Sequence, residues 1–193
     1  EVYVPPYLAN METTRKNLAS YYDEIARLDY YTGQVIKELK KQNVLDNTVI
    51  IFIADNGRPF PRCKTRLYDS GIKTPFIVYY PHKIKTPGRV ARGLISSIDI
   101  APTILELADI GIPKTIQGVS FYNVLDNTDA NVRDYVFAEH NWHDDAADER
   151  MVRFKNFVYI RNRCLECSRF FLDYPSRRDL VTLQKEKRLS KGQ

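Results

Sequence analysis

The sequence predicts an α/β fold with a smaller antiparallel unit towards its carboxyl end. An amphipathic helical pattern covers about residues 12–42, and an unbroken apolar run over residues 48–54 follows it after a short turn. A helix, a turn and a buried strand in that order are typical of α/β folds. Two short strand-like runs, 151–154 and 157–160, are separated by Lys155-Asn156 and predict a hairpin. We therefore expect residues 1–130 to form the α/β part and residues 131–193 a small antiparallel subdomain with a basic tail.

Composition places the chain among ordinary globular proteins. Of its 193 residues, 44% are hydrophobic and 27% charged, which excludes disordered, collagen-like and coiled-coil classes. No apolar run approaches the roughly 18 residues that a membrane-spanning helix needs, so we expect no membrane span. The net charge is +5, and residues 151–193 alone hold eleven Lys and Arg against four Asp and Glu. That basic stretch could attract a polyanion or be a solvated tail, and no nucleic-acid-binding signature accompanies it.

The first elements follow from local patterns. Residues 1–10 contain Pro5-Pro6 and predict an extended lead-in. The helix that follows has apolar positions three, four and seven apart. These positions are Leu18, Tyr21, Tyr22, Ile25, Leu28, Val35, Ile36 and Leu39. The run from Thr48 to Ala54 is rich in β-branched residues and suits a strand covered on both faces, as in a parallel sheet.

The later elements are shorter. Residues 76–80 predict a second strand, closed by Pro81. A helix is predicted from Asp99 to about Asp109, with Asp99 as its N-cap. Pro102 is tolerated in its first turn, and Gly111 follows its end. Residues 135–138 predict a further strand.

Candidate metal ligands stand directly after the first apolar strand. Ligands of open α/β sheets bind at the carboxyl ends of strands, and Asp55-Asn56-Gly57 begins there. A carboxylate beside an amide carbonyl offers the hard oxygen donors that Ca²⁺ or Mg²⁺ prefers. The same three residues also favour a plain β-turn, so this tripeptide alone leaves both interpretations open.

The residues that follow extend the pattern. Lys64 lies nine residues after Asp55, Tyr68 four residues further on and Gly71 three after that, before a proline-led strand at Pro75. This order and spacing resemble the second signature of the sulfatase family of the alkaline-phosphatase superfamily. The resemblance covers most of residues 4–161. Within the family, Pro59-Phe60-Pro61 and residues 139–144 are similar to the heparan N-sulfatases (N-sulfoglucosamine sulfohydrolases).

The resemblance implies a fold, a reaction and roles for named residues. The fold would be part of an alkaline-phosphatase-like sandwich, a parallel-rich sheet with helices. The reaction would be hydrolysis of sulfate esters or N-sulfates of sulfated sugars by a formylglycine nucleophile, in an extracytoplasmic compartment. Asp55 and Asn56 would hold calcium, or magnesium, together with two further acids. Lys64 would contact the sulfate as a catalytic and substrate-binding cation, and His140 and His143 would contact substrate from a loop.

Part of the family pattern is absent from the sequence. The formylglycine signature reads Cys or Ser, any residue, Pro or Ala, any residue, Arg, and none of Cys63, Cys164 or Cys167 begins it. We expect the nucleophile and the other two acids upstream of Glu1, which makes the chain the carboxy-terminal half of a sulfatase and inactive alone. Cys164 and Cys167 have zinc or redox spacing without a second pair and are otherwise two ordinary cysteines.

Other interpretations stay open. A phosphodiesterase or phosphonate hydrolase of the same superfamily is the nearest alternative, and a non-catalytic fragment that binds a glycan or a partner is the alternative from another class. His140 and His143 could also be a metal pair or part of a solvated loop.

Overall fold

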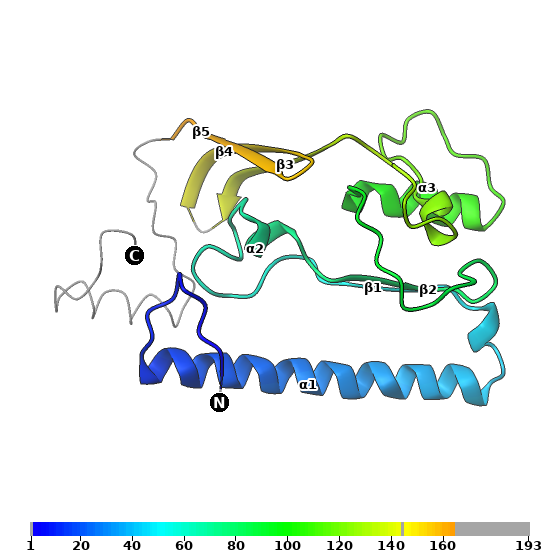
Figure 1. Cartoon of the computed structure of the whole chain (residues 1–193), viewed down its shortest axis with the longest axis horizontal. Helices are drawn as coiled ribbons and strands as arrows, with labels where there is room; N and C mark the ends of the chain where they lie inside the picture. Colours follow the sequence, from blue (N-terminus) through cyan, green and yellow to red (C-terminus); the bar gives the residue numbers. More distant parts are fainter. Residues whose placement is uncertain (1, 144, 165–193) are drawn as a thin grey trace.

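The structure is a computed structural model and describes residues 2–143 and 145–164. A long helix runs along one side, a two-stranded sheet lies beside it, and a three-stranded sheet and a short helix lie above that (Figure 1). In chain order the α-helices and strands are α1 (Glu12–Lys41), β1 (Ile50–Ile53), α2 (Asp69–Ile72), β2 (Phe76–Tyr79), α3 (Ile100–Leu107), β3 (Tyr135–His143), β4 (Asp145–Phe154) and β5 (Phe157–Asn162). Three short 3-10 helices complete them: Leu45–Asn47, Ser97–Asp99 and Tyr122–Leu125.

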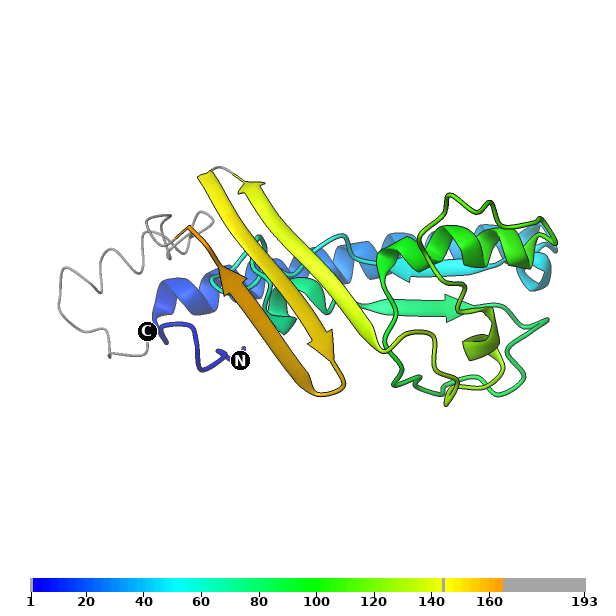
Figure 2. The same cartoon turned by 90° about the horizontal axis from the view of Figure 1, so that it is seen from above.

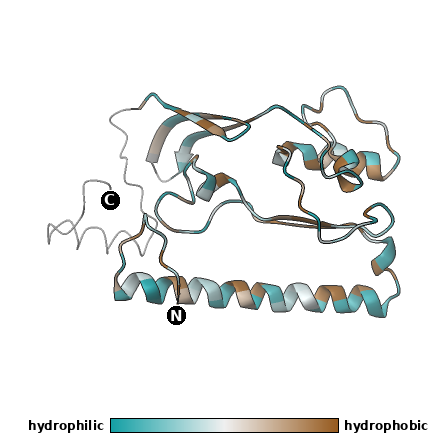
Figure 3. Ribbon diagram, viewed as in Figure 1, coloured by the Kyte–Doolittle hydropathy of each residue, from teal (hydrophilic) through white to brown (hydrophobic). Residues whose placement is uncertain are grey.

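Helix α1 confirms the predicted helix to within a residue at its end. It stops in a Schellman arrangement, in which Asn43 takes a left-handed φ of 57° and Val44 N donates to Leu39 O at 3.1 Å. Only Thr14 and Leu18 of the helix are buried. Of the apolar positions further along, Tyr21, Ile36 and Leu39 are partly buried, whereas the other four are exposed, from 38% for Tyr22 to 61% for Val35. Hydrophobic and hydrophilic residues alternate along the helix (Figure 3). The described residues therefore leave half of the predicted apolar stripe uncovered.

The expected parallel sheet is not formed by the described residues, because β1 and β2 pair antiparallel. Ile50 lies opposite Tyr79 and Ile53 opposite Phe76. The connection between the two strands folds back, so that β2 begins beside the last residue of β1. An antiparallel pair of this kind needs no crossover connection. Ala54 N donates to Pro75 O at 3.4 Å at this junction. Ile53 and Ile77 are 45% and 60% exposed, so the unbroken apolar run does not mean burial on both faces here.

Asp99 occupies the N-cap position of α3, as predicted, but its side chain has a different role. The 3-10 helix Ser97–Asp99 precedes α3, and Ser96 caps it in a capping box with Asp99. The Asp99 side chain makes no cap to α3 itself. Its carboxylate reaches back to Ser96 N at 2.7 Å and across to Val119 N at 2.8 Å, and it pairs with Arg133.

Strands β3, β4 and β5 form one antiparallel sheet, which confirms the predicted hairpin as β4–β5. The expectation of a loop that carries His140 and His143 is wrong, because β3 continues to His143 and β4 begins at Asp145. Opposite charges face each other across this extension, as in Glu139 opposite Arg150, and cross-strand pairs of this kind stabilise a sheet. Seen from above, the sheet crosses α1 obliquely (Figure 2), and Arg153 of β4 pairs with Asp69 of α2.

Two earlier expectations concern the end of the chain. Most of the basic stretch, together with Cys167, lies outside the described residues. Cys164 is disulfide-bonded, whereas Cys63 is a free and buried thiol.

Among the helices that the structure describes, none has the length and apolar character needed to cross a membrane.

Candidate active site

Two glycines close the loop that carries the predicted site residues. Gly57 N donates to Gly71 O at 2.8 Å, so the chain just after β1 lies against α2 and closes the loop between them. A Cβ on Gly57 would lie 2.0 Å from Ser70 O, and one on Gly71 would lie 2.1 Å from Arg66 O. No side chain fits at such distances, so the two backbones approach because both residues are glycine.

Asp55 and Asn56 stand where β1 ends and have suitable donor atoms for a hard cation. Asp55 Oδ1 accepts from Asn56 N at 2.9 Å. Asn56 Nδ2 donates to Gly57 O at 2.7 Å, which fixes the amide and leaves Oδ1 as the atom for a ligand. Asp55 is exposed and Asn56 half-buried. The pair therefore fits Ca²⁺ or Mg²⁺, but over the described residues no group of three or more His, Cys, Asp or Glu could hold a metal ion.

Lys64 lies in the same closed loop. Its backbone N donates to Arg58 O at 3.1 Å, which ties it to the residues just after Asn56. The residue is half-buried, and its ammonium group has no hydrogen bond or ion pair to any residue that the structure describes. A cation held in this way remains available to an anionic ligand.

A small apolar core supports the loop from below. Phe60 and Cys63 pack with Leu8 and Leu18, and all four are at most 6% exposed. Arg58 Nη2 donates to Tyr7 Oη at 2.5 Å, and Tyr7 Oη lies 3.4 Å from Cys63 Sγ.

This contact perturbs two of its groups. Burial and the Cys63 hydrogen bond raise the pKa of Tyr7 in spite of Arg58. Burial alone would lower the pKa of Arg58, but its hydrogen bonds to Tyr7 and Cys63 outweigh that effect and raise it. The residues before α1 thus help to hold the loop, a role that the predicted extended lead-in did not suggest.

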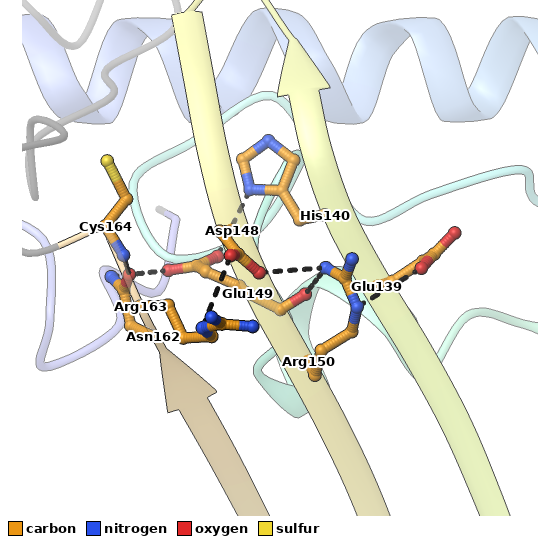
Figure 4. A network of polar contacts seen from close by, with 8 residues as sticks. All are labelled: Glu139, His140, Asp148, Glu149, Arg150, Asn162, Arg163 and Cys164. Atoms are coloured by element: carbon orange, nitrogen blue, oxygen red, sulfur yellow. Dashed lines mark hydrogen bonds and ion pairs between the residues drawn. The ribbon is translucent and has the colours of Figure 1, made fainter.

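His140 lies on β3 and is linked to the loop through Glu149. His140 Nδ1 is 3.1 Å from Glu149 Oε2 (Figure 4). Arg66, two residues after Lys64, has its Nη1 3.6 Å from Glu149 Oε1. His140, Glu149 and Arg66 are 10%, 12% and 11% exposed in their side chains. The structure therefore connects His140 to the loop that carries Lys64. The connection runs through the pairing of β3 with β4, and His140 itself is on a strand.

His143 lies elsewhere on the same strand. It is the last residue of β3 and pairs in register with Asp145, beyond an irregularity between His140 and Trp142. It is partly buried.

Sequence reasoning missed the partners that hold these residues. Arg66 lies between Lys64 and Tyr68 of the signature, but nothing in the spacing indicated its ion pair with Glu149. Glu149 stood among several acids near His140, and only the strand register shows that it is the one opposite His140.

Comparisons with known proteins identify the family of the chain. The family model "Sulfatase" matches residues 3–110, and the model "N-sulphoglucosamine sulphohydrolase, C-terminal" matches residues 63–174. An ulvan-active sulfatase of Formosa agariphila is 33% identical over 98% of the chain. The N-sulphoglucosamine sulphohydrolase of Homo sapiens is 38% identical over 59% of it. The chain spans 32% and 23% of the lengths of these two relatives.

Solved structures show the same fold. A Bacteroides thetaiotaomicron protein assigned to the sulfatases superposes with a TM-score of 0.73 at 21% identity, over 94% of this chain and 44% of its own. A phosphonate monoester hydrolase from Silicibacter pomeroyi gives 0.59 at 24% identity, over 94% and 42%. The fold class predicted from the resemblance is confirmed by these neighbours, and the family by the sequence matches. The chain therefore belongs to the sulfatase family and has part of its alkaline-phosphatase-like fold.

Proposed function

We propose that the protein carrying this chain hydrolyses sulfate groups on sulfated sugars, with the N-sulfate of heparan-type glucosamine as the favoured substrate. The observation that carries the proposal is the loop closed by the Gly57–Gly71 contact, which contains Lys64 and begins directly after Asp55 and Asn56. The family supports the sulfatase reaction. The match of residues 63–174 to the N-sulphoglucosamine sulphohydrolase model supports the N-sulfate.

Asp55 and Asn56 are proposed ligands of a calcium ion, with magnesium as the alternative. A bound divalent cation would polarise the sulfate and stabilise the attacking oxygen. Two oxygen donors are fewer than the 6–8 that calcium gathers, so we expect the other ligands and the formylglycine outside this sequence. For the same reason the chain alone should bind calcium weakly and should not turn over sulfate esters.

Lys64 is proposed to hold a sulfate oxygen. Its charge has no partner among the described residues and would offset the negative charge that grows in the transition state. His140 and His143 are proposed to contact the sugar, in an enzyme located outside the cytoplasm.

The test measures turnover of glucosamine N-sulfate, an aryl sulfate and a phosphonate monoester by the protein that carries this chain. We compare Asp55→Ala with Asp129→Ala, an exposed acid in a distant turn. Asp55→Ala should lose turnover and calcium affinity together, because it removes a ligand, whereas Asp129→Ala should keep both. Preference for the phosphonate ester would support the neighbouring hydrolase class instead. Binding of the sugar without turnover would support a glycan-binding role. Either result contradicts the proposal.

A further inference from the structure

His140 is nine-tenths buried, and only one of its two ring nitrogens has a hydrogen-bond partner. Nδ1 faces Glu149, whereas Nε2 is shielded from solvent and meets no hydrogen-bonding atom of the described residues. In Figure 4 the second nitrogen points away from Glu149. Buried polar atoms are normally satisfied, so an unsatisfied one indicates a ligand or a residue that is absent here.

Glu149 is held in place by three elements. Arg66 of the loop and Asn162 of β5 both lie on Oε1, at 3.6 and 3.3 Å. Oε2 is left for His140 of β3. Because its contacts come from three sides, the carboxylate cannot turn without losing at least one of them.

This arrangement selects one form of the imidazole. A carboxylate only accepts hydrogen bonds, so His140 must carry a hydrogen on Nδ1. In the neutral ring the lone pair is then on Nε2, which becomes an acceptor. Free histidine in water prefers the opposite tautomer, so the protein must impose this one.

We propose that Glu149 is a positioning residue that fixes the Nδ1–H tautomer of His140 and so presents Nε2 as an acceptor for an N–H or O–H group of the substrate. The identity of that donor rests on the proposed function: in a sulfated aminosugar it is the nitrogen-bound hydrogen or a neighbouring hydroxyl. Arg66 contacts the same carboxylate and links this acceptor to the loop that carries Lys64.

The first test is a side-chain ¹⁵N NMR spectrum of protein labelled in its histidines, with the His140 signals assigned by their loss in His140→Gln. In alkaline solution the parent should show hydrogen on Nδ1. Glu149→Gln should shift His140 towards the Nε2–H form, because an amide can donate to Nδ1 as well as accept from it. Glu139→Gln is the matched control, since Glu139 is an acid of the same sheet that pairs with Arg150 at 3.3 Å and not with His140. Hydrogen on Nε2 in the parent overturns the proposal, and this outcome needs no variant to fold.

The second test compares two substrates. Glu149→Gln should lower kcat/KM about tenfold for the aminosugar sulfate, the effect of about one hydrogen bond, and leave an aryl sulfate without that donor unchanged. Equal losses on both substrates would mean that Glu149 is merely structural and would contradict the proposal. If the parent hydrolyses neither substrate, the proposed function fails, while the NMR spectrum still decides the tautomer.

Discussion

Asp99→Asn should be among the most destabilising isosteric changes in the chain. The carboxylate is fully buried, and each of its oxygens faces two donors. Oδ1 accepts from Val119 N at 2.8 Å and from Arg133, and Oδ2 accepts from Ser96 N at 2.7 Å and from Arg133 Nε at 2.9 Å. The substitution keeps the shape but replaces one oxygen by an NH₂ group, which cannot accept.

The cost follows from that geometry. Whichever way the amide turns, its NH₂ faces two N–H groups, so two hydrogen bonds are lost and one of them is to the Arg133 guanidinium. Arg133 is 15% exposed and would be left without its carboxylate. Removing one partner of a buried ion pair costs about 3–5 kcal/mol, in line with two lost bonds at about 1–3 kcal/mol each.

Urea unfolding followed by circular dichroism measures the effect. The control is Asp126→Asn, whose carboxylate is 58% exposed and lies 3.9 Å from Lys83, and which should cost less than about 1 kcal/mol. A double-mutant cycle with Arg133→Met should give a coupling of at least about 1 kcal/mol. A loss of unfolding free energy below about 1 kcal/mol for Asp99→Asn, or no coupling with Arg133→Met, would refute the conclusion that the hydrogen bonds of the Asp99 carboxylate stabilise the fold.

Three further predictions concern the loop and its support. Lys64→Ala should reduce sulfatase turnover about 10²–10³-fold and leave the urea midpoint unchanged. Lys73→Ala, at an exposed lysine, is the control for both measurements, and near-parental turnover of Lys64→Ala would refute the sulfate contact. Gly71→Ala should destabilise by at least about 1 kcal/mol, because its Cβ would meet two carbonyl oxygens at 2.1 and 2.2 Å, whereas Gly33→Ala, with open space in α1, should stabilise by about 0.5–1 kcal/mol. Because the pKa of Tyr7 is raised in the native state, the native Tyr7 keeps its proton at a pH where the unfolded chain has lost it. The free energy of unfolding therefore falls as pH rises above about 10. Tyr7→Phe should make this fall shallower in unfolding curves measured across this range.

Local patterns predicted the elements that depend on local forces. The α1 helix was expected to within a residue and the turn of the β4–β5 hairpin at its observed place, because periodicity and turn residues act between neighbours in sequence, although β4 begins six residues earlier than expected. The direction of β2 relative to β1 was not predictable in this way, since it depends on how residues 54–75 fold back. The apolar stripe of α1 was predicted correctly as a pattern, but a pattern does not say what covers it.

The candidate site divides along the same line. Asp55, Asn56 and Lys64 were found from spacing, and their roles stay predictions. The surroundings of His140 could not be found, because Glu149 opposes it only through the register of β3 and β4. The loop expected around His140 and His143 was also wrong, since both residues are on β3.

The backbone of the loop gives a physical reason to regard Lys64 and Arg66 as functionally distinct. Thr65, between them, has a left-handed φ of 67°, which is unfavourable for a β-branched residue and costs about 1–3 kcal/mol. The loop tolerates this because its contacts fix the backbone on either side, including Lys64 N to Arg58 O and Arg66 N to Cys63 O at 3.0 Å. At this turn the chain passes from a lysine whose charge is unpaired among the described residues to an arginine that lies 3.6 Å from Glu149. A relaxed backbone at Thr65 would change the direction of the chain between the two cations, so the strain helps to keep Arg66 at Glu149 and Lys64 available to an anion.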